Sequence, residues 1–139
     1  EVFDEDLIAI LRDELHTEEE RFKLEYLHFY SGSAAIPTAT VRIRSGETVK
    51  EGAAIGDGPV DAAYKAISQV TGLSPALGRY EIRAVTGGTE AMGEVTLRLE
   101  AEGRRVLGRG ASTDVIEASV KAYIDGLNKL AALGVGAAR

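Results

Sequence analysis

The chain has 139 residues, a mass of 14.7 kDa and a formal net charge of −6 at pH 7. Its 45% hydrophobic and 27% charged residues are typical of one ordinary globular domain and exclude a disordered chain. The acidic balance and the scattered Lys and Arg residues argue against nucleic acid as a partner, because that affinity depends on neutralising phosphates. The absence of cysteine excludes disulfides and thiolate nucleophiles, and it fits a reducing cytoplasm.

The N-terminal residues predict a linker ahead of the main domain. Residues 3–15 place apolar side chains at helical spacing, which predicts a short amphipathic helix that needs a surface to pack on. The charged stretch HTEEER follows as a connection. We therefore assign residues 1–20 to a linker helix or subdomain and residues 21–139 to the domain itself. The apolar positions of the helix are Leu7, Ile8, Ile10, Leu11 and Leu15.

The same residues bear on location. The start of the chain, EVFDEDLIAI, is acidic and has no signal-peptide pattern, and no apolar run reaches the length of a membrane span. We therefore expect a cytoplasmic protein with no membrane partner. Because the chain does not begin with Met, we also expect it to be a piece of a longer protein.

Residues 22–72 predict a first unit of three strands and one helix. Alternating patterns indicate strands at 22–30, 38–44 and 48–55. A helix then begins at the loop GDGP, where Pro59 suits the first helical position, and Gly72 is placed to end it. One face of the first strand is expected to carry Phe22, Leu24, Tyr26 and His28, and the apolar stripe of the helix Val60, Ala63, Tyr64, Ile67 and Val70.

Residues 80–133 repeat this order. Strands are predicted at 80–85, 94–100 and 104–111, with a glycine-rich turn at 86–93. Thr113 or Ser112 is expected to cap the last helix, and residues 134–139 are expected to fray. The apolar stripe of that helix is Ile116, Val120, Tyr123, Ile124, Leu127 and Leu130.

The repetition predicts the fold class. The chain is expected to be α+β, with two β-β-β-α units related by an internal pseudo-two-fold axis and preceded by a short linker helix. The helix-opening stretches GDGPVDAAYKAI and STDVIEASVKAY match with a constant offset, so that Asp61, Lys65 and Ala66 correspond to Glu117, Lys121 and Ala122. Under such symmetry the two helix N-termini would face a shared cleft.

Signs of catalysis are lacking in the sequence. His16 and His28 have no companions at metal-ligand spacing, and no serine lies in a G-x-S-x-G setting. Gly56-Asp57-Gly58 is neither a dinucleotide-binding fingerprint nor a phosphate-binding loop with its lysine. We therefore expect neither catalytic residues nor a cofactor nor a metal in this chain.

The two helix-opening loops remain as a candidate binding site. A helix N-terminus offers free N–H groups and partial positive charge to a carboxylate, and glycines allow close approach. Asp57 and Asp114 would offset an ammonium group, and the apolar neighbours would suit a small apolar amino acid. The alternative is that the polar residues are only helix caps and the glycines only turns. The residues alone leave both readings open.

Four stretches, in this order, resemble one known family: SGSAAIPTATVRI, GDGPVDAAYKAI, AVTGGTEAMGEVTLRL and GRGASTDVIEASVKAYIDGLNKL. Together they are similar to the C-terminal regulatory domain of bacterial 2-isopropylmalate synthases, over about residues 22–130. The leading VFDEDLIAIL resembles the subdomain that joins this family's catalytic barrel to the regulatory domain. The resemblance implies that residues 21–139 are a regulatory domain, that the catalytic domain of a parent enzyme is a partner, and that the domain dimerises.

The resemblance also implies a function. The parent enzymes condense acetyl-CoA with 2-oxoisovalerate on a metal-dependent barrel, which this chain lacks, so a divalent metal is expected only there. L-leucine, the end product of the pathway, binds the regulatory domain and inhibits. Many relatives carry Asn where this chain has Asp57. The matching loops are Gly56, Asp57, Gly58 and Pro59, and Ser112, Thr113 and Asp114, with Val60, Ala63, Tyr64, Ile67 and Ile116 added as lining residues.

Two alternatives to leucine sensing stay open. The same fold senses isoleucine in the related citramalate synthases, and a pocket separates such isomers by only about 1–3 kcal/mol. The motifs AVTGGTEAMGEV and STDVIEAS favour leucine. A purely structural dimerisation domain is the other alternative, against which the glycines at positions 56 and 58 argue.

Overall fold

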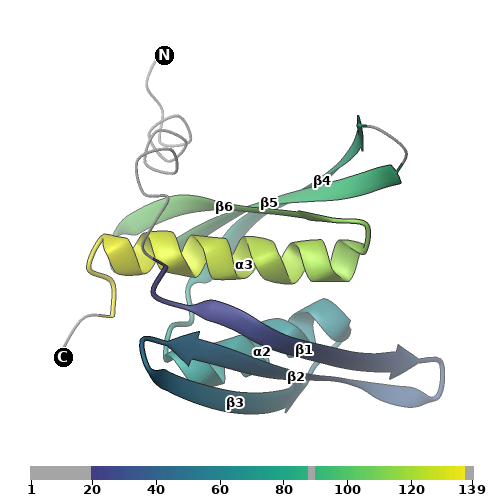
Figure 1. The fold of residues 1–139 in the computed structure, drawn as a ribbon, viewed down its shortest axis with the longest axis horizontal. Coiled ribbons are helices and arrows are strands. Elements are labelled where there is room, and N and C mark those ends of the chain that lie inside the picture. The colour runs from purple at the N-terminus through teal and green to yellow at the C-terminus, as the bar shows by residue number, and fades with distance from the viewer. Residues whose placement is uncertain (1–19, 88–89, 137–139) are drawn as a thin grey trace. The chain divides into compact units, whose positions relative to one another are not determined.

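The computed structural model describes residues 20–87 and 90–136, which form two β-β-β-α units (Figure 1). The first unit comprises residues 22–74, and the second comprises residues 75–136 together with Glu20 and Arg21. The α+β class with two such units is thereby confirmed. The predicted leading helix lies outside the described residues. The pseudo-two-fold axis, the linker at 1–20 and the domain limits stay predictions.

The first unit is a three-stranded antiparallel sheet with one helix on one face. Strands β1 (Lys23–Gly32), β2 (Ala35–Ser45) and β3 (Thr48–Ile55) follow in that order, and α2 (Pro59–Thr71) packs on β2 and β3. Alternate residues of β2 are buried, as its pattern predicts: Ala39, Val41 and Ile43. Gly72 ends α2 with a φ of 77°, a left-handed conformation that glycine adopts without a Cβ clash.

Strand β1 departs from the predicted alternation, in which four residues shared one face. A register shift lies between Leu24 and Tyr26, so Glu25 is the additional residue of a β-bulge. Because a bulge reverses the alternation beyond it, the prediction is wrong after Leu24. The core face carries Leu24, Leu27 and Phe29, opposite Ile43, Val41 and Ala39, and the exposed face carries Tyr26, His28 and Tyr30.

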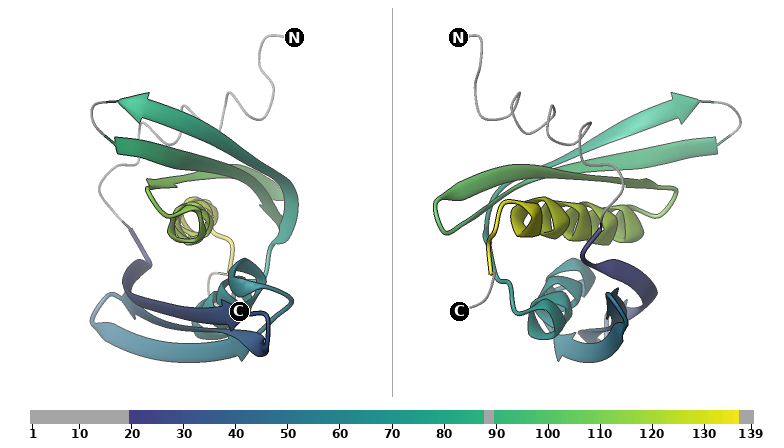
Figure 2. Two further views of the ribbon diagram at one scale, coloured as in Figure 1. Left: turned by 90° about the vertical axis from the view of Figure 1, so that its right-hand side faces the viewer. Right: turned by 60° about the vertical axis from the view of Figure 1, so that its left-hand side comes forward.

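The second unit repeats the architecture with longer elements. Strands β4 (Ala76–Gly87), β5 (Glu90–Ala101) and β6 (Arg104–Ser112) form an antiparallel sheet, and α3 (Val115–Ala132) lies against one face of it (Figure 2). The β5–β6 turn uses positive φ at Glu102 and Gly103, as a tight hairpin requires. The buried core comprises Val95, Leu97, Leu99, Val106, Val120, Leu127 and Leu130.

Two predicted boundaries in this unit are wrong. The glycine-rich stretch 86–93 is not one long turn, because Thr86 pairs with Ala91 and Gly87 with Glu90 in the β4–β5 ladder. The chain after α3 is not frayed at its start. Val135 is buried and its N–H donates to Leu130 O at 3.0 Å, while Gly134 N–H donates to Ala131 O at 3.0 Å. These bonds form the Schellman motif, with Gly134 at a φ of 93°.

Each helix crosses its outer strand closely at a glycine. A Cβ on Gly52 of β3 would lie 2.7 Å from Val70 Cγ2, and one on Gly108 of β6 would lie 2.1 Å from Ala122 O. Gly52 and Gly108 are opposite Val41 and Leu97 in the two ladders, so they hold the same register in both units. The repeat seen in the sequence therefore extends to how the helices pack.

Candidate functional site

The start of helix α2, residues 56–61, is here called the α2 opening. Gly56 N–H donates to Pro37 O at 3.1 Å, which ties the loop to β2. Asp57 N–H donates to Asp61 Oδ2 at 2.9 Å, and Asp61 forms an ion pair with Lys65 at 3.0 Å. The hydrogen bond from Asp57, and then the one from Lys65, hold the pKa of the Asp61 carboxyl below its usual value. The loop is thus held by its own side chains before any ligand binds.

The two glycines of the α2 opening have different reasons to be glycine. A Cβ on Gly56 would lie 2.5 Å from Ala62 N and 2.8 Å from Ala62 Cα, so the close approach to α2 excludes any side chain there. Gly58 has a φ of −163°, an extended conformation open to all residues, and a Cβ there would meet nothing within 4 Å. Packing therefore requires glycine at position 56, but neither packing nor backbone conformation requires glycine at position 58.

The start of helix α3, residues 112–117, is here called the α3 opening, and it is closed by its own carboxylates. Asp114 is the N-cap, and its side chain accepts from Ile116 N–H at 2.8 Å and Glu117 N–H at 3.4 Å. Asp114 N–H donates to Ser112 Oγ at 3.1 Å, and the Ser112 hydroxyl donates to Glu117 Oε1 at 2.7 Å. The prediction of Thr113 or Ser112 as the cap is wrong, because the carboxylate of Asp114 reaches both N–H groups.

The two openings differ at one equivalent position. Gly58 and Asp114 are both N-caps, 56 residues apart, but Gly58 supplies no side-chain cap. In α3, Asp114 caps the N–H groups of the second and third helical residues. The equivalent N–H groups of α2, those of Val60 and Asp61, have no side-chain cap. Free N–H groups, the partial positive charge of a helix start and open space together suit a carboxylate ligand.

Because only α3 of these two helices has a side-chain cap, two matched substitutions at the N-caps are expected to lower the free energy of unfolding by different amounts. Asp114→Ala is expected to lower the free energy of unfolding by about 1 kcal/mol, because two N–H groups lose their cap. Gly58→Ala, which removes no cap, should change it by less than about 0.5 kcal/mol. Urea unfolding of both variants measures the difference. Equal costs would show that the Asp114 bonds do not stabilise α3.

The residues predicted for the site differ in exposure. Asp57, Thr113 and Asp114 are exposed, and Ser112 is buried. Ala63 and Ile67 of α2 are fully buried. Half-buried positions are Gly56, Gly58, Pro59, Val60, Tyr64 and Ile116. The two openings belong to different units, and the expectation that they face one cleft stays a prediction.

Two residues that shape the openings were not predicted as site residues. Asp61 and Glu117 are the third residues of their helices, and each holds its loop through its carboxylate. An acidic residue three positions after an N-cap is the pattern of a capping box, and this signal was available in the sequence. Its importance follows from the observed bonds to Asp57 and Ser112.

The described residues provide no metal centre, since no three of their His, Asp or Glu side chains are grouped to hold an ion. His28 lies on the exposed face of β1. Among the helices formed by residues 20–87 and 90–136, none has the length and apolar character needed to cross a membrane.

Comparison with known proteins identifies the family. The model of the family described as LeuA allosteric (dimerisation) domain matches residues 1–131. The 2-isopropylmalate synthase of Heliobacterium modesticaldum is 52% identical over 94% of this chain and 25% of its own length. Those of Carboxydothermus hydrogenoformans and Thermus thermophilus are 53% and 44% identical, over 94% and 91% of this chain and 26% and 38% of their own. The chain thus spans only a part, about a quarter in the first two, of the relatives it matches.

The order of elements, the paired helix openings and the match over residues 1–131 agree with one another. They also agree with the resemblance that the sequence motifs carry. The chain belongs to the LeuA allosteric (dimerisation) domain family.

Proposed function

We propose that this chain is the allosteric module of a 2-isopropylmalate synthase and that it binds L-leucine at the α2 opening. The observation that supports this most is the uncapped start of α2, where Gly58 provides no side-chain cap for the Val60 and Asp61 N–H groups and a Cβ on Gly58 would meet nothing within 4 Å. The leucine carboxylate would take the place that the Asp114 side chain occupies in α3. The Asp114 carboxylate at the start of α3 thereby indicates how the leucine carboxylate would bind at the start of α2.

The remaining groups of leucine have matching residues. The Asp57 side chain is exposed at the edge of the opening, and its charge would offset the ligand ammonium. Val60 is half-buried and would contact the isobutyl group. Pro59 and Tyr64 would complete the site, while Ala63 and Ile67 would support it from the core.

For the parent protein we propose feedback inhibition of leucine biosynthesis. The chain itself would contribute no catalytic residue, and the acyl transfer from acetyl-CoA, with its divalent metal, would belong to a catalytic barrel outside this chain. The relatives carry the name 2-isopropylmalate synthase, and the family description includes dimerisation. A cytoplasmic homodimer is therefore part of the proposal. Leucine would couple to the active site with an energy of typical size, about 1–3 kcal/mol.

Titration calorimetry with leucine, isoleucine and valine tests the proposal. Saturable heat with leucine is expected, with isoleucine binding about tenfold or more weakly, because one shifted methyl group costs about 1–3 kcal/mol. Preference for isoleucine would assign the domain to the citramalate synthase branch. A dimer in gel filtration that gives no heat with any of the three would leave only a structural dimerisation domain.

A further inference from the structure

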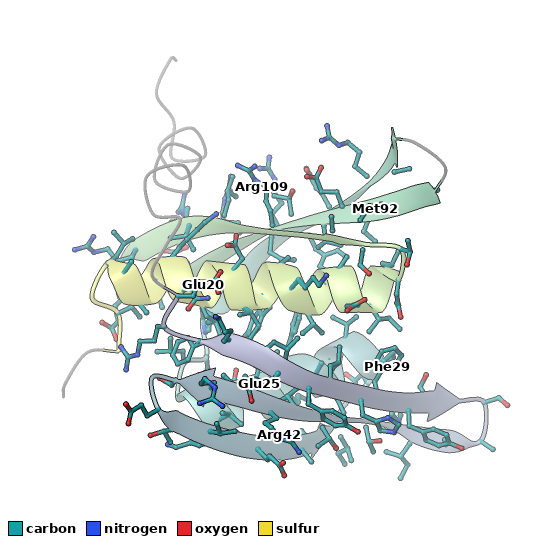
Figure 3. The ribbon with its side chains drawn as sticks, viewed as in Figure 1. Glu20, Glu25, Phe29, Arg42, Met92 and Arg109 are labelled. Carbon is teal, nitrogen blue, oxygen red and sulfur yellow. The ribbon has the colours of Figure 1, made fainter. Side chains whose placement is uncertain are left out.

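The face of the second sheet that is turned away from α3, here called the outer face, is covered around Leu107 and Arg109, although no described helix packs on it. Its residues on β5 and β6 include Thr96, Arg98, Arg105, Leu107 and Arg109, because Val95, Leu97 and Leu99 point to the helix side. Figure 3 shows Arg109 on this side of the sheet. Of the described elements in this unit, α3 is the one helix that packs on the sheet, and it covers the opposite face.

Leu107 marks the covered area. It is only 5% exposed, although its strand neighbours Arg105 and Ala111 are exposed. Nη2 of Arg109, the next residue of β6 on this face, is also buried, and it has no hydrogen-bond partner in the described part of the chain. A buried guanidinium nitrogen without an acceptor is costly, so this position calls for an acidic partner.

The first unit supplies an internal control. The position equivalent to Leu107 is Glu51, which is directly opposite Arg42 as Leu107 is opposite Arg98. The Glu51 side chain is 57% exposed and pairs with Arg42 at 2.7 Å in solvent. The same register thus gives an open polar face in one unit and a covered apolar position in the other, so the architecture alone does not bury Leu107.

We infer that the outer face of the second sheet is the docking surface of the chain's own N-terminal segment, residues 3–15. Glu20 and Arg21 precede β1 in the chain, yet they belong to the second unit, so the segment starts from that unit. Its sequence has an apolar stripe that needs a surface, and residues 1–20 contain nine acidic residues and one arginine. The stripe would pack on Leu107, and a carboxylate would accept from Arg109.

The charges of the outer face agree with this occupant. Arg79, Arg83 and Arg105 already pair with glutamates of the same unit at 3.4, 2.7 and 3.6 Å. Arg109 is the position where an additional carboxylate would complete a bond. The docking does not depend on leucine. If the proposed function also holds, the docked segment would contact β6, and this strand ends at Ser112 in the α3 opening.

Thiol labelling tests the docking, because the chain has no cysteine of its own. Leu107→Cys and, as its matched control, Glu51→Cys are each placed in the full chain and reacted with a disulfide reagent. Leu107→Cys is expected to react at least about tenfold more slowly, because its reaction requires local opening. Adding Leu11→Asp, which puts a charge in the apolar stripe, should bring the two rates together. Arg12→Asp, beside the stripe, should not.

The other results overturn the proposal. Equal rates for Leu107→Cys and Glu51→Cys would show that the face is open. A slow rate that Leu11→Asp leaves unchanged would exclude the segment as the cover, and a slow rate that rises on dilution instead would assign the face to a second copy of the chain. Circular dichroism of each variant verifies that the fold is intact.

Discussion

Gly58→Asp is expected to abolish leucine binding while leaving the fold at least as stable as before. The new carboxylate would cap the Val60 and Asp61 N–H groups, as Asp114 does in α3, and would occupy the place of the ligand carboxylate. Hydrogen bonds to a charged group contribute about 1.5–3 kcal/mol each, so the loss of two predicts a fall in affinity of about a hundredfold or more. Calorimetry and thermal unfolding of the same sample measure both effects.

The control for this substitution is Gly58→Ala, which fills open space without capping. Its affinity for leucine is expected to stay within about tenfold of the original, because both N–H groups remain free. Gly56→Asp is a poor substitute, because a Cβ at that position would lie 2.5 Å from Ala62 N and disturb the fold. Unchanged leucine affinity in Gly58→Asp would remove the α2 opening from the site.

Gly108→Ala is expected to cause a large loss of stability, about 3 kcal/mol. The new Cβ would lie 2.1 Å from Ala122 O and 2.8 Å from Gly126 N, so helix α3 would have to move away from β6. Backbone atoms cannot rotate away as a side chain can, and the separation would loosen the packing around Val106 and Leu127. Urea unfolding of the full chain measures the change.

Two other glycines provide a graded comparison. Gly52→Ala is expected to cost about 1 kcal/mol, because its nearest neighbour is the side-chain atom Val70 Cγ2 at 2.7 Å. Gly78→Ala should change stability by less than about 0.5 kcal/mol, since its nearest contact, at 3.7 Å, is ordinary. If all three variants unfold at the same urea concentration, close helix–strand contact is not what requires glycine at position 108.

The asymmetry between the two openings agrees with the proposal that only the α2 opening binds a ligand. One helix start is closed by Asp114, Ser112 and Glu117, so its loop is held in place without a ligand. The other lacks the equivalent cap and has space in front of Gly58. A duplicated unit can thus keep one copy of a helix start as a support and leave the other for a ligand.

Local patterns were sufficient to predict the elements and their order. Alternation identified β2 and β5, helical spacing identified α2 and α3, and Gly72 marked the end of α2, because these signals act between neighbours in the chain. The internal repeat and the family followed from the same motifs. The bulge at Glu25, the extended β4–β5 ladder and the Schellman motif at Gly134 were missed, because each depends on pairing or packing that periodicity does not record.

The sequence by itself thus determined the fold class, the duplication and the two helix starts as a candidate site. Only the tertiary structure separated the roles of similar residues. Gly56 is required by contact with Ala62, whereas Gly58 has open space, and Asp114 caps its helix whereas Asp57 does not. The physical reason is that a cap, a close approach or a covered Leu107 depends on distances between atoms that adjacent residues in the chain do not set.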